Sequence, residues 1–366
     1  MTRRHLCDAR WSSLLRHVSG LVDLDGTARR FGAVQRVRRL GRAEDLLRLA
    51  LLYGPGGLSL RGSAEAACAL GMAETLSGKA VLGRLRRMGD WLDHILRALL
   101  DDIGVALGGE LALVDGTLVY SCGPGRPGFR VHALYEPALG RFTDFRVTTD
   151  RVREAATNTR LAPARTMLFD RGFARVRDIA AVLGAGSDMV TRIGWRSMKL
   201  FDQAAQRLDV MALLPSGDAP CERQVHIAGV AAPLRLVVQR LPPAQAASQA
   251  RRTRRRASKN CQRPDARTER AAGYLMLLTS LPAERADAAQ VVDLYRARWQ
   301  VELGFKRLKS LGALDSLRAA NPALARTWLL AHSIAAVLTE ELASRLAGFS
   351  PQRRSIEQAP AQLISA

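Results

Sequence analysis

One stretch near the end of the chain brings a phenol, a carboxylate and several cations to helical spacing. Tyr295, Arg298, Glu302 and Lys309 stand three, four and seven residues apart. A helix turns about 100° per residue, so these side chains would fall within an arc of roughly 60°, with Lys306 at its edge. Such a face suits a carboxylate that binds a metal ion while the cations bind neighbouring phosphates. The simpler interpretation is an exposed face with a Glu-to-Lys pair worth ~0.2–0.5 kcal/mol.

The element that would carry this face is a single long helix. Asp287 is a suitable first cap, because Gln290 three residues later completes a capping box. The sequence therefore predicts one helix over 287–309.

The chain as a whole is strongly basic. Its 366 residues carry 55 Lys plus Arg against 34 Asp plus Glu, a net charge of +21. Such a surface attracts polyanions, and the guanidinium of Arg can bind a phosphate with two hydrogen bonds. Segment 251–270 alone holds nine Lys or Arg. It is typical of a solvated loop or an exposed helix, but beside a nucleic-acid site it would lie along a phosphate backbone.

Several classes of protein are disfavoured. With 48% hydrophobic residues the chain can form a buried core. The most apolar stretch, 328–338, is too short to span a bilayer, and no secretory signal opens the chain. Five cysteines without a C-x-x-C pair predict reduced thiols in a cytoplasmic protein rather than disulfides or a zinc site.

Residues 1 to about 105 have helical periodicity, and part of this region resembles a helix-turn-helix. Ser63 is a candidate cap for one helix, Gly71 for the turn, and Ser77 for the cap of a second helix. Such pairs are also common in bundles that bind no nucleic acid. Three cations decorate the second helix and are candidates for DNA contacts: Arg84, Arg86 and Arg87.

From about residue 110 the pattern changes to strands, with helices between some of them. The predicted strands are 111–119, 129–135, 142–148, 166–169, 188–193, 224–227, 234–241 and 274–277, with a helix over 176–183. Strands in succession followed by alternating strands and helices predict an α/β fold with a mixed sheet.

At this point the sequence resembles a known family, the DDE transposases of bacterial insertion sequences, specifically the insertion-sequence-four family. The spaced set Tyr295-x2-Arg298-x3-Glu302-x6-Lys309 matches the signature of that family in all four positions. LVDGT at 113–117 is similar to its first acidic motif and FDRGF at 169–173 to its second. The stretches AEDLLRLALLYG, LSLRGSAEAACALG and TSLPAERADAAQVVDLYRARWQVELGFKRLKS also resemble family members.

The resemblance implies catalytic and metal-binding roles for Asp115, Asp170 and Glu302. Asp115 would bridge two metal ions, Asp170 would hold one of them, and Glu302 the other. Two hard cations roughly 3.5–4 Å apart can activate the attacking oxygen and stabilise the leaving oxygen of a phosphodiester. Mg²⁺ is the expected ion, with Mn²⁺ as a substitute.

The resemblance also implies further DNA contacts. Tyr295, Arg298, Lys309 and Arg192 would contact DNA near the cleaved end, with Lys306 beside them. Trp195 is a candidate for stacking on an unpaired base, although a half-buried structural role fits it equally well.

The resulting prediction is a ribonuclease-H-like catalytic core, interrupted by a mostly β insertion and preceded by an all-helical DNA-binding region. The predicted boundaries are 1–105 for the helical region, 106–195 and 279–345 for the core, 196–278 for the basic insertion and 346–366 for a tail.

The predicted activity is cut-and-paste transposition. The partners would be double-stranded DNA, as terminal inverted repeats and target, and a second copy of the chain in a homodimer, with no membrane involved. The protein would be cytoplasmic and nucleoid-associated when acting. Two alternatives stay open: a decayed, non-catalytic DNA-binding relative, and a structure-specific nuclease of the same fold.

Overall fold

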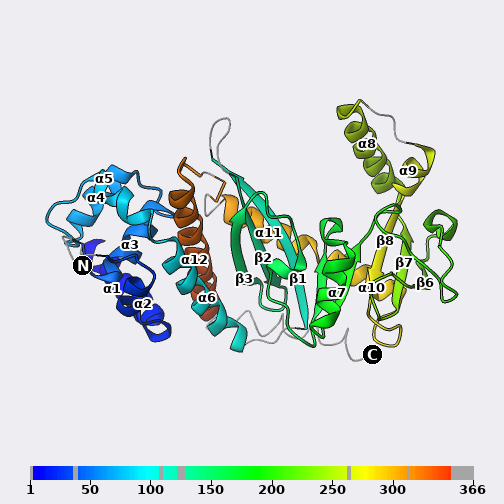
Figure 1. Cartoon of the computed structure of the whole chain (residues 1–366), viewed down its shortest axis with the longest axis horizontal. Coiled ribbons are helices and arrows are strands. Elements are labelled where there is room, and N and C mark those ends of the chain that lie inside the picture. Colours follow the sequence, from blue (N-terminus) through cyan, green and yellow to red (C-terminus); the bar gives the residue numbers. More distant parts are fainter. Residues whose placement is uncertain are drawn as a thin grey trace. The chain divides into compact units, whose positions relative to one another are not determined.

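The computed structural model describes residues 3–35, 40–106, 110–121, 128–261, 265–310, 314–315 and 317–347. Within these ranges the chain forms helices and one eight-stranded sheet (Figure 1). It divides into two compact units. One unit comprises Met1–Leu107, Leu118–Arg130 and Lys306–Ala366, and the other comprises Gly108–Thr117 and Val131–Phe305.

Helices account for most of the first unit. They are α1 (Arg3–Leu21), α2 (Leu24–Arg30), α3 (Ala43–Tyr53), α4 (Leu60–Ala69), α5 (Gly78–Leu85), α6 (Gly89–Ala106) and α12 (Pro322–Ala347). Apolar residues recur along one face of α6, where Trp91, Ile95 and Leu99 are buried. This face packs against α12, which carries the buried Leu330 and Ile334 (Figure 1).

Two helices, α4 and α5, lie where the sequence predicts a pair that resembles a helix-turn-helix, and one predicted cap differs. Ser59, not Ser63, caps α4, because its Oγ accepts a hydrogen bond from the backbone N–H of Gly62 at 2.9 Å. Ser63 lies buried inside that helix, so its prediction as a cap is wrong. Gly71 forms the turn with a φ of +73°, and Ser77 caps α5 as predicted.

Every predicted strand is present, with ends that differ by at most three residues. The strands are β1 (Leu111–Tyr120), β2 (Gly128–Glu136), β3 (Arg141–Thr149), β4 (Thr166–Phe169), β5 (Asp188–Arg192), β6 (Cys221–Val225), β7 (Leu234–Arg240) and β8 (Tyr274–Thr279). Their order in the sheet is β3-β2-β1-β4-β5-β8-β7-β6. β4 is parallel to both β1 and β5, whereas β8 is antiparallel to β5 and to β7. The strands of segment 196–278 therefore extend the same sheet through β8 rather than forming a separate one.

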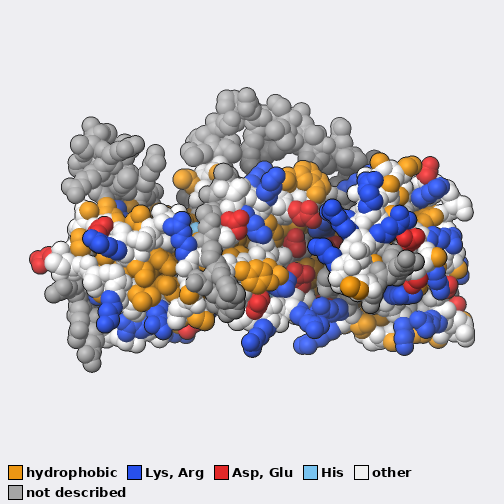
Figure 2. Space-filling view, turned by 90° about the horizontal axis from the view of Figure 1, so that it is seen from above, with side chains coloured by type: hydrophobic (Ala, Val, Ile, Leu, Met, Phe, Trp, Pro, Cys, Tyr) orange, Lys and Arg blue, Asp and Glu red, His pale blue; other side chains and the backbone are white. Residues whose placement is uncertain are grey.

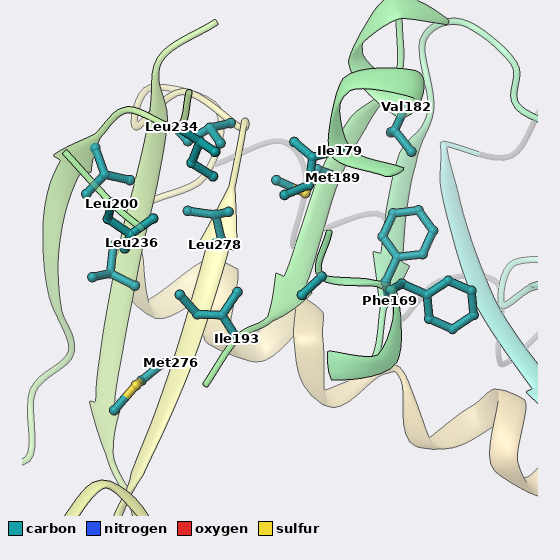
Figure 3. Packing of buried hydrophobic residues seen from close by; sticks show 14 of the residues in the cluster. Phe169, Ile179, Val182, Met189, Ile193, Leu200, Leu234, Leu236, Met276 and Leu278 are labelled. Carbon is teal, nitrogen blue, oxygen red and sulfur yellow. The ribbon is translucent and has the colours of Figure 1, made fainter. Parts of the chain in front are cut away.

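A hydrophobic cluster on one face of this sheet holds the second unit together. Ile179 and Val182 of α7 (Val176–Gly184) are buried, and Figure 3 shows Ile179 beside Met189 of β5. The cluster continues through Leu236 and Leu278 of β7 and β8. The opposite face of the sheet also buries apolar side chains, among them Leu113, Leu168 and Val190.

The basic segment is an exposed helix, which settles the choice between loop and helix. α8 (Pro243–Lys259) has no buried residue, and the short α9 (Ala266–Ala271) follows it. Arg254 of α8 forms an ion pair with Glu269 of α9, with Nε and Oε1 2.8 Å apart.

The helix predicted over 287–309 is in fact two helices, α10 (Ala288–Arg296) and α11 (Trp299–Ser310). The capping box at Asp287 is confirmed. The prediction of one continuous helix is wrong. The backbone N–H groups of Ala297 and Arg298 donate to the carbonyls three residues earlier, Leu294 and Tyr295, rather than four residues earlier as in an α-helix. These tighter turns break the α-helical progression between the two helices.

Among the described residues, no helix has both the length and the apolar character needed to cross a bilayer.

Candidate active site

Asp115 and Asp170 lie on neighbouring parallel strands in equivalent positions. Val114 of β1 pairs with Phe169, the last residue of β4. Asp115 is the next residue of β1, and Asp170 directly follows the end of β4 with an extended backbone. Val114 and Phe169 belong to the hydrophobic cluster. Since side chains alternate along a strand, the two aspartates project from the opposite face of the sheet. The sheet register thus brings together two carboxylates that are far apart in sequence.

The surroundings of Asp115 are unfavourable to its negative charge. Burial, together with the charges of Glu154 and Asp170, raises the pKa of the Asp115 carboxyl to about 6. The N–H of Gly116, which donates to Oδ1 at 2.7 Å, and the guanidinium of Arg298 oppose this shift. A carboxyl group in this position gains from a nearby cation.

Tyr295 reaches the same place from α10. Its hydroxyl lies 3.4 Å from Oδ1 of Asp170, to which it donates a hydrogen bond. Burial and the negative charge of Asp170 raise the pKa of the Tyr295 phenol far above its usual value, so the group stays protonated. The Tyr295 hydroxyl can therefore donate a hydrogen bond to Asp170 at any physiological pH.

Arg298 stands in the turn between α10 and α11 and contacts residues of both helices. Its NH2 donates to Oε1 of Glu302 at 2.5 Å, and its guanidinium carbon lies 5.9 Å from the centre of the Tyr295 ring. Glu302 lies in the first turn of α11, where the helix dipole stabilises a negative charge. Among the described residues, Asp115, Asp170 and Glu302 do not all come within 4.8 Å of one another.

Close packing fixes α11 beside the sheet. Gly304 lies so near β3 that a Cβ there would stand 2.8 Å from Cζ of Phe142. The next residue, Phe305, contacts the same ring, with centroids 5.3 Å apart. These contacts set the position of Glu302 two residues earlier.

A pocket of about 510 Å³ is lined by Asp170 and by several arginines. Arg192 and Trp195 line it from the end of β5, and Arg252 and Arg256 line it from α8. The guanidinium carbons of Arg196 and Arg267 lie 4.1 and 4.8 Å from the centre of the Trp195 ring. In the view of Figure 2, Lys and Arg side chains gather on the right-hand part of the surface, where α8 and β6–β8 lie in Figure 1.

The remaining predicted DNA contacts lie outside this group. Lys306 is exposed and Lys309 half-buried on α11. Arg84 is half-buried and donates to the carbonyl of Ala80 in its own helix. The two arginines after α5 are exposed: Arg86 and Arg87.

Two further residues join the site that the sequence did not single out. Glu154 raises the pKa of Asp115, and its Oε2 would lie 2.5 Å from a Cβ placed on Gly172 in the FDRGF motif. It stands in a polar loop without a periodic pattern, so no sequence signal marks it. Trp299 opens α11 beside Arg298 with 54% of its surface exposed. Its position next to Arg298 is visible in the sequence, whereas its exposure emerges only from the fold.

The chain matches known proteins over nearly its whole length. The family described as Transposase DDE domain matches residues 107–338. The putative transposase InsL for insertion sequence element IS186A, from Escherichia coli (strain K12), is 36% identical over 364 residues, covering 95% of this chain and 98% of that protein. The chain belongs to the DDE transposase family of insertion sequences. The transposase for insertion sequence element IS421 of Escherichia coli is also similar to this transposase, with 35% identity over the same shares of both chains.

Membership in the family places this transposase among enzymes that cut DNA and transfer its strands with divalent metal ions. The carboxylates described above fit such ions. Burial and, to a smaller extent, the charges of Glu154 and Asp170 raise the pKa of Asp115, so its ionised form is costly. A divalent cation would offset that cost, because it favours the ionised form of each ligand.

Proposed function

We propose that this transposase cleaves and joins DNA at a centre formed by Asp115, Asp170 and Glu302. The observation that carries the proposal is the register of β1 and β4, which sets the two aspartates side by side on the face of the sheet opposite to the hydrophobic cluster. The strand order β3-β2-β1-β4-β5 supports a ribonuclease-H-like core, to which β8, β7 and β6 are added at one edge. We propose that segment 196–278, which supplies these three strands, is an insertion into that core.

Mg²⁺ is the proposed cofactor, as two ions, with Mn²⁺ as a substitute. Asp115, Asp170 and Glu302 would hold the ions. When bound, such ions activate an attacking oxygen and stabilise the leaving oxygen of the phosphodiester. Carboxylates are the ligands that both ions prefer.

The protein's own side chains would prepare the site for DNA. Arg298 bonds Glu302 at 2.5 Å. A DNA phosphate offers this guanidinium two acceptors in a matching plane, so the phosphate would replace Glu302 as its partner. Glu302 would then turn toward the two aspartates, and Tyr295 would keep Asp170 oriented through its hydroxyl.

The basic surfaces would hold the DNA on either side of the reacting bond. Arg252 and Arg256 reach the pocket beside Asp170 from a helix that has no buried residue. We assign them to the phosphate backbone, together with Arg192. Trp195 is less suited to stacking on a base, because two guanidinium groups already lie near its ring.

Recognition of the terminal inverted repeats is proposed for the helical region, through the cations of and after α5: Arg84, Arg86 and Arg87. Expressed alone, residues 1–105 should bind repeat DNA more tightly than random DNA, with an affinity that falls with salt. If residues 1–105 fold but bind repeat and random DNA equally at every salt concentration, recognition belongs elsewhere. Pairing of two inverted repeats predicts a homodimer in the complex with DNA.

The test of the catalytic centre uses a DNA duplex that carries the flanking ends of the element. Asp115→Asn, Asp170→Asn and Glu302→Gln each remove an anionic ligand with little change in volume, so each should abolish Mg²⁺-dependent nicking without loss of folding or DNA binding. Asp293→Asn on α10 is the matched control, because Asp293 is exposed and pairs only with Arg296 in the described contacts. Near-normal nicking by any of the three would remove that residue from the centre.

The same assay separates the two alternatives. A decayed relative would bind the ends but not nick them under any metal. A structure-specific nuclease would cut branched DNA without regard to the terminal sequence.

A further inference from the structure

Three helices of the first unit bring an imidazole and two carboxylates together. His17 comes from α1, Asp102 from α6 and Glu341 from α12. His17 Nε2 lies 3.0 Å from Glu341 Oε2, and one ligand atom of each residue lies within 4.8 Å of the other two. His17 and Glu341 are largely buried, with side-chain exposures of 21% and 13%. Asp102 is exposed.

We propose that this cluster binds a divalent transition-metal ion, and that the ion is Zn²⁺. It is separate from the proposed catalytic centre, all of whose carboxylates belong to the second unit. It does not rest on the proposed function. The chemistry of the donors selects the ion, because imidazole binds Zn²⁺ readily whereas Mg²⁺ prefers oxygen ligands alone.

The spacing of the three donors fits a tetrahedral ion. Bonds of about 2.0–2.2 Å to nitrogen and oxygen put neighbouring ligand atoms roughly 3.3–3.6 Å apart. His17 and Glu341 already approach that separation. The third ligand needs a shift of at most about 1.5 Å to reach it, and Asp102 can make that shift by rotating its side chain because it is exposed. Three protein ligands leave the fourth position for water.

An ion pair between His17 and Glu341, without any metal, would explain the 3.0 Å distance between these two side chains. It does not explain the third donor. A protonated imidazole carries one positive charge, and the two carboxylates beside it carry two negative charges. A divalent cation bound to a neutral imidazole balances both, so the complete set of three suits a metal better than an ion pair.

The consequence of metal binding would be a link between distant parts of the chain. Residues 17 and 341 are 324 positions apart in sequence. Among its described side chains, α1 contributes the buried Val18 to the core and Trp11 to a contact with Arg48, whose guanidinium lies 5.2 Å from the ring centre. An ion held by three helices would add a bond that exists only in the folded state and would stabilise this unit.

The experiment uses the full chain with Asp115→Asn and Asp170→Asn as a common background, which removes binding at the proposed catalytic centre. Zn²⁺ binding is measured by calorimetry, and melting is followed with Zn²⁺ or Mg²⁺. We expect one Zn²⁺ per chain and, at about 100 times the Kd, a rise in Tm of roughly 5–10 °C. Mg²⁺ at the same concentration should leave Tm unchanged.

Two variants and one control locate the ion. His17→Gln and Asp102→Asn should each weaken Zn²⁺ binding by about 10-fold or more and remove the rise in Tm. Asp102→Asn keeps the test valid if His17→Gln fails to fold, since Asp102 is exposed. Asp101→Asn changes the neighbouring exposed carboxylate, which is not a member of the cluster, and should bind Zn²⁺ like the background.

Three results would overturn the proposal. They are the absence of Zn²⁺ binding, unchanged binding in Asp102→Asn, and a Co²⁺ complex whose near-ultraviolet spectrum shows charge transfer from a thiolate ligand. The last would mean that the ion is held by cysteine. Because the background lacks catalytic carboxylates, none of these results bears on the proposed DNA cleavage.

Discussion

Gly304 sets how closely α11 approaches β3, and a single methyl group there should move the helix. The added Cβ of Gly304→Ala would lie 2.8 Å from Cζ and 3.0 Å from Cε2 of Phe142, whereas ordinary contacts begin at 3.4 Å. The ring is fully buried and packed against Tyr135 and Phe145, with centroids 5.2 and 4.9 Å away. Because the ring has no space to retreat, α11 must shift by about 0.6 Å.

The shift should lower activity as well as stability. Overpacking of a core costs about 1–3 kcal/mol, and replacing a helical glycine with alanine returns up to ~1 kcal/mol. The net loss in the free energy of unfolding is therefore about 0–3 kcal/mol. Glu302 lies two residues from the clash and moves with the helix. A displacement of 1 Å can cost about 100-fold in rate, so a shift of about 0.6 Å should slow strand cleavage on the order of 10-fold.

The assay compares initial nicking rates at saturating Mg²⁺ with urea unfolding of the same protein. Gly184→Ala is the matched control, since no atom lies within 4 Å of the added Cβ at the end of α7. It should nick at the wild-type rate and be unchanged or slightly more stable. If Gly304→Ala loses stability as expected but nicks at the wild-type rate, then the approach of α11 to β3 does not control the position of Glu302.

Three further predictions address the other contacts. Arg298→Ala and Lys309→Ala should keep the wild-type Tm and most DNA affinity but lose about 100-fold in strand cleavage, and wild-type excision in both would return them to a solvated helix surface. Arg252→Ala should bind DNA more weakly and reduce the salt slope by about 0.9; an unchanged slope in a titration of binding against salt would exclude a phosphate contact. Burial lowers the pKa of His332 to about 4 from 6.5, so the unfolded chain binds more protons between these values and stability falls as pH drops through them. Urea unfolding at pH 7 and 4.5 should show a loss of up to about 3 kcal/mol that His332→Leu lacks, and parallel profiles would contradict it.

The strands were predictable because each depends on a local pattern. The run around Asp115 and the short run before Asp170 are apolar and bounded by turn residues, which identifies both as strands without knowledge of their neighbours. The caps at Asp287 and Ser77 were predictable for the same reason, since a cap involves residues three positions apart. Ser63 shows the limit of this reasoning, because Ser59 is an equally suitable cap and tertiary burial decides between them.

The parts of the site that depend on register and loops could not be predicted. No local pattern pairs Val114 with Phe169, although this pairing sets the two aspartates together. Glu154 approaches Asp115 from a loop whose path follows from the packing of Ala156 and Asp178, where the carboxylate of Asp178 accepts the backbone N–H of Ala156 at 2.9 Å. Such contacts depend on the whole fold rather than on spacing in the sequence.

The break between α10 and α11 gives the spaced motif a different physical meaning from the one its spacing indicates. In a continuous helix Tyr295 and Glu302 would stand about 10.5 Å apart along the axis. The break instead ends α10 just after Tyr295, whose hydroxyl reaches Asp170, and starts a new helix in which Glu302 occupies the first turn. Arg298 lies in the turn and contacts both residues. A rigid shared face would fix these side chains relative to one another, whereas a turn lets Arg298 exchange Glu302 for a phosphate without moving Tyr295. The spacing of the motif therefore encodes a turn and a helix start.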